Sequence, residues 1–375
     1  MREISIETFT HVEGFTYESS GILDEFKSLI VNWRARSYNE FTLTVLLENY
    51  TIDLLKNNSI LLIDDCFFYV DSVLVDSNTA GLVNVRGKSL LGKATKRIVI
   101  PPYSTNSKRP ELIAHELLDK NMITPILSDR RLDYLSLAKA PNFGSDPISF
   151  QNSYGVLAEE VEQLCVAYDF CVRENAKNIV TPESEIEFYK GRDLSGDGGV
   201  EFRSNFDNLK SEGFEHSISD WATAAYVFGE GEGAKRKQVI VIQDMSTGKP
   251  TGLDVNEIYV DARDLQQSYQ NEAGQQVTLT DEQYKAQLIQ RGEQALSQRL
   301  EILNVSGEID LTNQMFEYKV DYDLGDRVRV TSDLFGLTKT SVLTEMEEVW
   351  DTEGYHLTPT FDQESPTIFD KLRRK

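Results

Sequence analysis

The sequence predicts an α+β fold that is mainly β, and three observations support this prediction. Segments that alternate polar and apolar residues fill residues 1–100, and in the clearest of them Phe41, Leu43 and Val45 share one face of a strand. Similar β-rich segments return after Val200. Between and within these regions, apolar residues recur at steps of three and four, the spacing of an amphipathic helix. At roughly 150 residues per domain, a chain of 375 residues predicts two or three domains.

Residues 1–100 are predicted to form the first β domain. Short polar breaks separate its apolar segments, and such breaks suit hairpins between antiparallel strands. Consecutive short antiparallel strands favour a barrel or a sandwich. Beyond the segment around Phe41, strands are expected at residues 60–63, 66–75 and 81–86.

Residues 101–182 are predicted to form a mixed α/β domain. Pro110 stands near the start of a helix expected over 110–120, whose leucines share one face. A second helix is expected over 155–167, because its apolar residues recur at three- and four-residue steps. Strands are expected at 170–173 and 186–190, with a polar turn region between them.

The second β domain is predicted to be discontinuous, over 183–265 and 306–360, with a helical insertion at 266–305. The longest helix is expected over 281–303, where Thr280 and Gln283 match a capping box. After it, alternation over 316–322 predicts a hairpin that continues through Val328 and Val330. The other strands of this domain are expected at 200–202, 226–228, 238–243, 257–260 and 342–350, and residues 361–375 form a tail.

Charge and cysteine content limit the functional classes. The chain carries 38 basic and 61 acidic residues, a net charge of −23, which disfavours sequence-specific binding to the phosphate backbone of nucleic acids. Three cysteines, Cys66, Cys165 and Cys171, fit reduced core thiols better than a disulfide framework or a zinc site. No stretch approaches the ~18 consecutive apolar residues that a transmembrane helix needs, and the N-terminus lacks the pattern of a signal peptide.

Several segments imitate catalytic or binding motifs but lack a required residue. The segment 87–93 follows a phosphate-binding glycine loop until Ala94, which replaces the hydroxyl residue that would bind Mg²⁺. The segment 193–198 resembles half of a calcium loop, but Ser204 stands where a bidentate glutamate is required. His115 has an aspartate, Asp119, at the second metal position of a zinc-protease pattern. We therefore predict no catalytic residue, no metal ligand and no cofactor.

A glycine-rich segment at 229–233 invites comparison with an anion-binding nest. Its two glutamates would repel phosphate, so a mobile hairpin loop is the better interpretation. Carboxylate pairs of the kind that hydrolyse glycans are recognised by their separation in space, which the sequence does not give.

Three stretches, taken in order and with their spacing, resemble the hub proteins at the tail tip of siphophages that infect Gram-positive hosts. The first runs from Gly191-Arg192-Asp193 to Phe202, the second contains Asp261 and Arg263, and the third contains Gly325-Asp326. The residues that carry the resemblance, with a structural role expected for each, are Gly191, Arg192, Asp193, Phe202, Asp261, Arg263, Gly325 and Asp326.

The resemblance implies a scaffold rather than an enzyme. Proteins similar to this chain have two β-barrels related to the tail-tube fold, so that three chains present six barrels and adapt a six-fold tail to a three-fold tip. The implied partners are two further copies of the chain, a distal tail protein above, a fibre, spike or receptor-binding protein below, and the tape measure protein. The implied location is the virion tail tip, after assembly in the host cytoplasm, with an acidic channel through which DNA can slide.

One alternative from another functional class stays open. A tail-associated hydrolase that acts on cell-wall peptide or glycan would also fit a tail-tip location, although its carboxylates cannot be located in the sequence.

Overall fold

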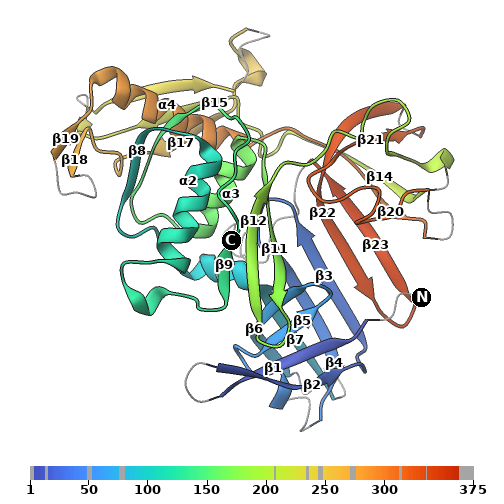
Figure 1. Ribbon diagram of the computed structural model, residues 1–375. Coiled ribbons are helices and arrows are strands. Elements are labelled where there is room, and N and C mark those ends of the chain that lie inside the picture. Colours follow the sequence, from blue (N-terminus) through green and yellow to red (C-terminus); the bar gives the residue numbers. More distant parts are fainter. Residues whose placement is uncertain are drawn as a thin grey trace.

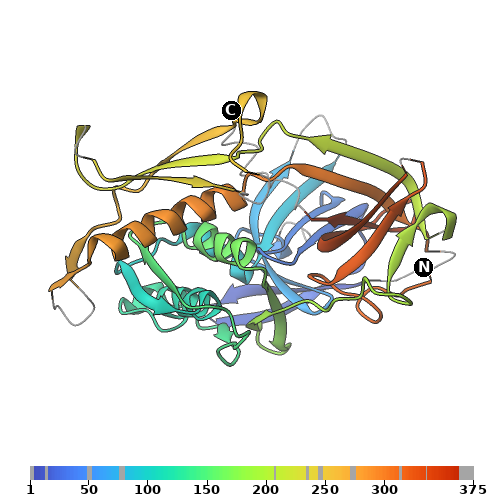
Figure 2. The same cartoon turned by 90° about the horizontal axis from the view of Figure 1, so that it is seen from above.

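The protein is described by a computed structural model, in which an eleven-stranded sheet and a smaller helix-covered sheet flank a helical part (Figure 1). The view from above shows helix α4 (Asp281–Ser297) running beside α3 (Leu157–Ala167) at the boundary between the small sheet and the helical part (Figure 2). The residues described are 4–12, 16–48, 53–75, 81–206, 208–233, 236–243, 248–270, 276–311, 315–334 and 336–362. The predicted tail at 361–375 lies outside this description beyond Asp362.

The N-terminal strands are antiparallel and follow the predicted alternation. β4 shows it most clearly, because Phe41, Leu43 and Val45 are buried while the residues between them are half-buried. The strands expected at 60–63 and 66–75 are confirmed, and the one expected at 81–86 continues to Ser89. The strands are β1 (Ile6–Val12), β2 (Thr16–Leu23), β3 (Ser28–Arg34), β4 (Glu40–Leu46), β5 (Ile60–Ile63), β6 (Cys66–Val75) and β7 (Leu82–Ser89).

Strands from the two ends of the chain form one sheet. The long strand β22 (Leu337–Trp350) pairs with β21 (Arg327–Ser332) through its first half, and with both β3 and β23 (Tyr355–Phe361) through its second half. The order is β13-β21-β22-β3-β4-β7-β6-β5-β1-β2, with β13 (Glu201–Arg203) parallel to β21 and β23 paired to β22. No closed barrel is found within the described part of the chain, so strands predicted for two separate barrels are instead hydrogen-bonded side by side.

One hydrophobic core runs through this large sheet. Met346 of β22 lies opposite Trp33 of β3 in the register, and both side chains are buried. The same core includes Phe68 from β6 and Phe361 from β23. Large aromatic side chains contribute most to such a core because each removes a large apolar area from water. The N-terminal and C-terminal strands are therefore held by shared packing as well as by hydrogen bonds.

The middle of the chain forms the helical part. The helices expected over 110–120 and 155–167 are present, with α2 passing into a π-helical turn at Asp119. The predicted domain boundary at residue 182 falls in the turn between the paired strands β11 and β12. The elements are η1 (Leu90–Lys96), β8 (Tyr103–Lys108), α2 (Pro110–Leu118), η3 (Ser128–Arg130), β9 (Leu135–Leu137), β10 (Ile148–Asn152), α3 (Leu157–Ala167), β11 (Cys171–Asn178) and β12 (Glu183–Tyr189).

A second, smaller sheet has its own core. The prediction assigned its strands to the second barrel and α4 to an insertion, but β15, β16 and β17 pack against α4 through Val227, Val241, Tyr284 and Leu288. The capping box of α4 is confirmed, because Gln283 N donates to Thr280 Oγ1 over 3.2 Å and Thr280 N donates back to Gln283 Oε1 over 2.9 Å. The elements are β15 (Ala224–Phe228), β16 (Gln238–Ile242), β17 (Glu257–Asp261), β18 (Ser268–Gln270), β19 (Gln276–Thr278) and α4 (Asp281–Ser297).

Two predictions in the C-terminal third are wrong. The helix expected to reach residue 303 ends at Ser297, and β20 (Ile302–Ile309) pairs with β14 (Leu209–Ser217). The strand expected over 316–322 is a turn, in which Lys319 adopts a positive φ of 68° and its N–H donates to the Tyr322 carbonyl over 2.8 Å. Tyr318 and Tyr322 are both buried, so a turn satisfies the alternation that suggested a strand.

Candidate functional site

Six of the eight motif residues belong to one junction, where the chain leaving β12 meets the turn before β21. The centre of this junction is the carboxylate of Asp326, which is almost completely buried. Its Oδ1 accepts a hydrogen bond from Arg192 N over 2.6 Å, and its Oδ2 accepts from Arg192 Nε over 3.0 Å and Nη2 over 2.6 Å. Charge-assisted bonds of this kind are about twice as strong as neutral ones.

The backbone completes the junction. Asp323 N donates to Asp326 Oδ2 over 2.9 Å, so the buried carboxylate accepts four hydrogen bonds. Arg327 N donates to the Arg192 carbonyl over 2.8 Å, and Leu194 N donates to the Arg327 carbonyl over 2.8 Å. A buried carboxylate is stable only when its lone pairs are satisfied in this manner. The junction therefore fixes the segment after β12 to the start of β21.

Two glycines allow the two segments to approach. A Cβ atom placed on Gly191 would lie 1.8 Å from the Gly325 carbonyl oxygen, which no side chain can tolerate. Gly325 itself has a φ of 85°, a conformation that L-residues rarely adopt. The glycines of the motif are thus explained by backbone contact, without any ligand.

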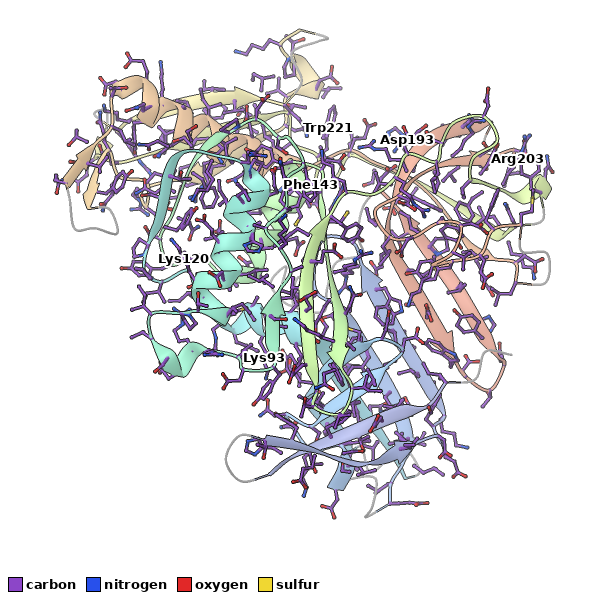
Figure 3. All side chains as sticks on the ribbon, in the orientation of Figure 1. Lys93, Lys120, Phe143, Asp193, Arg203 and Trp221 are labelled. Atoms are coloured by element: carbon purple, nitrogen blue, oxygen red, sulfur yellow. The ribbon has the colours of Figure 1, made fainter. Side chains whose placement is uncertain are left out.

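Phe202 and Asp193 extend the junction in opposite directions. Phe202 is buried in the large core, with its ring centroid 5.1 Å from that of Tyr322 and 5.4 Å from that of Phe361. Asp193 faces solvent at the edge of the sheet (Figure 3), where its carboxylate accepts from Ser195 N over 3.1 Å and Ser195 Oγ over 2.7 Å. These hydrogen bonds lower the pKa of Asp193 and stabilise a tight turn.

Asp261 and Arg263 lie elsewhere, at the end of β17 in the small sheet. Arg263 Nε and Nη2 donate to the Asp261 carboxylate, and Arg236 Nη2 donates to the same carboxylate over 2.7 Å. The hydrogen bonds from Arg263 lower the pKa of Asp261. The second motif therefore orders the turn after β17 and is not part of the Asp326 junction.

Sequence reasoning missed a contact that ties the C-terminal turn to the N-terminal strands. Lys319 Nζ lies 3.3 Å from Asp64 Oδ2 and 3.8 Å from Asp65 Oδ1, both in the β5–β6 turn. The same ammonium group lies 4.7 Å from the centre of the Trp33 ring, within the range of a cation–π interaction. No local pattern could reveal this contact, because 255 residues separate Lys319 from Asp64.

The segment that imitates a phosphate-binding loop is already occupied by a side chain of the protein. Leu90 N and Leu91 N, at the start of η1, donate to the two carboxylate oxygens of Glu174 over 3.2 and 2.7 Å. Burial raises the pKa of Glu174 to about 7. The backbone N–H groups that would hold a phosphate therefore hold a carboxylate from β11.

The other imitations also have structural partners. His115 Nε2 lies 3.0 Å from the Ala138 carbonyl oxygen, a hydrogen-bonding distance, and the imidazole ring packs near Phe188. In the calcium-like segment, Asp197 lies within 3.4 Å of Arg329. Within the described ranges no three His, Cys, Asp or Glu side chains are grouped as metal ligands. Cys66, Cys165 and Cys171 are buried, and none of them is in a disulfide.

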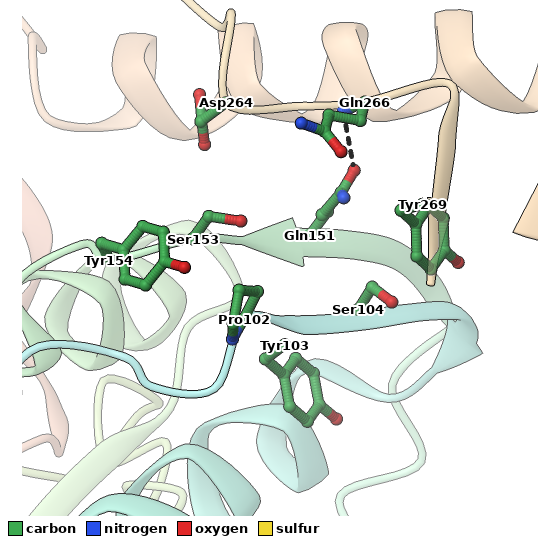
Figure 4. A pocket seen from close by; sticks show the side chains of 9 residues that line it. All are labelled: Pro102, Tyr103, Ser104, Gln151, Ser153, Tyr154, Asp264, Gln266 and Tyr269. Atoms are coloured by element: carbon green, nitrogen blue, oxygen red, sulfur yellow. Dashed lines mark hydrogen bonds between the residues drawn. The ribbon is translucent and has the colours of Figure 1, made fainter. Parts of the chain in front are cut away.

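A hollow of about 290 Å³ lies between β8, β10 and the segment after β17 (Figure 4). Its single carboxylate is that of Asp264, which pairs with Arg291 over 3.0 Å. Gln266 N donates to Gln151 Oε1 over 3.2 Å across one edge of the hollow. Polar side chains, tyrosine rings and Pro102 line the rest.

Comparison with protein families matches the chain to the siphovirus ReqiPepy6 Gp37-like proteins over residues 13–361. The chain belongs to this family. The match contains all three motif stretches and all the strands of the large sheet from β3 onward. A comparison with curated proteins found no match.

Solved structures of tail proteins share the fold over almost the whole chain. The tail protein of Neisseria meningitidis MC58 is 10% identical, with 97% of each chain covered and a TM-score of 0.54. The prophage tail protein gp18 of Listeria monocytogenes EGD-e is 12% identical, with 99% of this chain and 98% of that chain covered and a TM-score of 0.52. The 43 kDa tail protein of prophage MuSo2 from Shewanella oneidensis is 11% identical, with 96% and 97% covered and a TM-score of 0.52.

The fold also resembles a chain of the Francisella PdpA-VgrG complex, at 12% identity and a TM-score of 0.50, with 97% of this chain and 59% of that chain covered. At such identities, likeness concerns the fold alone. Among the residues that the structure describes, no helix combines the length and apolar character needed to span a membrane.

Proposed function

We propose that this protein is a phage tail protein, and that it forms a homotrimeric tail-tip hub, which adapts the six-fold tail tube or distal tail ring to a three-fold tip. Each chain would contribute two tube-like β modules, one from the β1–β7 strands and one from β13 and β21–β23. Three chains would then present six modules to the ring above. The proposal is architectural and assigns no catalytic residue.

The observation that carries the proposal is the joining of two strand groups from opposite ends of the chain. β22 is hydrogen-bonded to β3, so neither group can move independently of the other. The similarity to phage tail proteins over 97% of both chains supports the proposal, because it includes both strand groups and the parts between them. A rigid pair of modules suits a ring in which each copy fills two of six positions.

We assign the motif residues a role in keeping this pair rigid. The Arg192–Asp326 junction holds the chain leaving the helical part against the start of β21, with Gly191 and Gly325 permitting the contact and Phe202 anchoring it in the core. Asp193 closes the adjoining turn. Asp261 and Arg263 would order the turn after β17 in the same way.

The proposed partners follow from the position at the tip: a distal tail protein above, a fibre, spike or receptor-binding protein below, and the tape measure protein within. We propose that the chain lines part of the DNA exit channel. Three copies at −23 each would carry −69, and an acidic wall would let a polyanion slide rather than bind. The proposed location is the virion tail tip, with assembly in the host cytoplasm.

Light scattering of the purified chain tests the proposal. The expected result is three times the mass of one chain, alone or after addition of the distal tail protein. A single-chain mass under both conditions, over a hundredfold range of concentration, would contradict it.

A further inference from the structure

The positive charge of this acidic chain is concentrated in one segment. Residues 86–131 contain ten basic and four acidic residues, a net charge of +6, which leaves −29 on the rest of the chain. Basic and acidic residues are therefore separated along the sequence. If the fold keeps the basic residues together, the molecule has a positive patch on an otherwise negative surface.

The fold keeps four of these ten basic residues together. Lys93 and Lys96 are in the last turn of η1, Arg97 follows directly, and Arg130 of η3 donates to the carbonyls of Ile98 over 2.7 Å and Ile100 over 3.1 Å. We call Lys93, Lys96, Arg97 and Arg130 the basic cluster. Desolvation lowers the pKa of Lys93, and repulsion by Arg97, Lys96 and the nearby Lys88 lowers it further; Asp71 opposes the shift.

Three members of the basic cluster lack a carboxylate partner. Lys93 Nζ donates to the amide oxygen of Asn58 over 2.9 Å and lies 3.6 Å from the centre of the Tyr69 ring. Within the described ranges, neither it nor Arg97 nor Arg130 forms an ion pair. Lys93, Arg97 and Arg130 therefore have no carboxylate in the described part of their own chain as a partner, and a carboxylate from another molecule can pair with them.

A surplus of carboxylates occurs at the turn between β22 and β23. Glu308 of β20 lies 2.8 Å from His356 Nδ1, Asp351 lies 3.9 Å from His356 Nε2, and Glu353 is in the same turn. We call Glu308, Asp351 and Glu353 the acidic tip. None of the three is paired with Lys or Arg in the part of the chain that the structure describes. The acidic tip thus has carboxylates of the kind that the basic cluster lacks as partners.

The basic cluster and the acidic tip lie on different sides of the molecule. Figure 3 labels Lys93 at the foot of the helical part, whereas the β22–β23 hairpin lies on the opposite side of the molecule (Figure 1). A contact between two such features on separate copies is head-to-tail, and repeated head-to-tail contacts close into a ring when the rotation permits. A self-complementary two-fold contact would require both features on one face.

We propose that the basic cluster of one chain receives the acidic tip of the next chain, and that this contact orients the subunits in the ring. The inference depends on the homotrimer of the proposed function and names the surfaces that join its copies. The partner is therefore a second copy of this chain. Nucleic acid is the poorer partner, because a polyanion approaching the cluster meets a chain that carries −29 elsewhere.

Charge reversal tests the contact. K96E/R97E reverses the basic cluster, D351K/E353K reverses the acidic tip, and the four changes combined restore opposite charges at every contact of a ring. We expect each double variant to need at least a tenfold higher concentration than the wild type to trimerise, and the combined variant to recover. K96Q/R97Q should be intermediate. K249E/K285E is the matched control, because Lys249 and Lys285 are exposed and lie outside the cluster.

Thermal melting of each variant excludes misfolding as the cause of any loss. If the wild type is trimeric and both double variants trimerise like the control, the inference is wrong and the proposed function stands. If the combined variant does not recover, the pairing of these two surfaces is wrong. A wild type that stays monomeric both alone and with the distal tail protein contradicts both. If K96E/R97E remains trimeric but loses binding to a fluorescent single-stranded DNA, the cluster serves nucleic acid and the inference is overturned.

Discussion

The free energy of unfolding should depend on pH because burial raises the pKa of Glu174. The carboxylate is fully buried between β11 and η1, where it holds the N–H groups of Leu90 and Leu91. Burial raises its pKa from 4.5 to about 7, while the backbone donors and the hydroxyls of Ser89 and Ser184 oppose the shift. The buried Cys66 thiol is close enough to interact with Glu174, and its own pKa is raised by burial, by Glu174 and by Asp65.

The sign of the effect follows from linkage. Between pH 4.5 and 7 the folded protein keeps the Glu174 proton and the unfolded chain loses it, so the free energy of unfolding falls as pH rises. Below pH 4.5 both states are protonated, and above pH 7 both are ionised. At ~1.4 kcal/mol per pH unit, the window corresponds to a loss of about 3 kcal/mol.

Glu174→Gln removes this titration. We expect the free energy of unfolding of the wild type, minus that of E174Q, to fall by about 3 kcal/mol between pH 4.5 and 7.5. Urea denaturation followed by tryptophan fluorescence measures it. The matched control is Glu185→Gln on β12, an exposed carboxylate paired with Lys177, for which the difference should stay flat within about 0.5 kcal/mol. An equal pH slope in the wild type and in E174Q would refute the reasoning.

Three further predictions concern the motif junction and the acidic tip. Gly191→Ala should abolish or severely destabilise folding because its Cβ would meet the Gly325 carbonyl, whereas Gly196→Ala, with open space around it, should change the melting temperature little. Asp326→Asn should lower the free energy of unfolding in urea by about 2–3 kcal/mol, because an amide group would face N–H donors. Asp197→Asn, at an exposed position, should leave the free energy of unfolding nearly unchanged. The hydrogen bond to Glu308 raises the pKa of His356, so the contribution of this residue to the free energy of unfolding should be complete below pH 6.5 and decline at higher pH. In His356→Gln this pH-dependent part should be missing. If the free energy of unfolding of the wild type and of the variant depends on pH in the same way, the ion pair does not contribute as proposed.

Local patterns predicted the elements whose partners lie nearby. The capping box of α4 depends on Thr280 and Gln283 alone, and the alternation of β4 depends on one buried face, so both follow from the sequence. The end of α4 was missed because Leu303, which continued the apolar stripe, lies in β20 and pairs with β14. Periodicity records that a side chain is buried and does not record which element buries it.

Long-range contacts explain what the sequence could not reveal. The merging of two strand groups depends on the pairing of β22 with β3, whose residues are separated by about three hundred positions. The motif residues around Asp326 were identified by resemblance, but their shared carboxylate became visible only in the structure. The separate place of Asp261 and Arg263 has the same cause, since order along the chain does not fix distance in space.

Cryo-electron microscopy of the assembled protein tests the central claim most directly. The account predicts three chains around one axis, with the β1–β7 strands and the β21–β23 strands of each chain alternating to present six β modules on one face. A reconstruction in which only one strand group per chain reaches that face, or in which the chains pair about a two-fold axis, would contradict it.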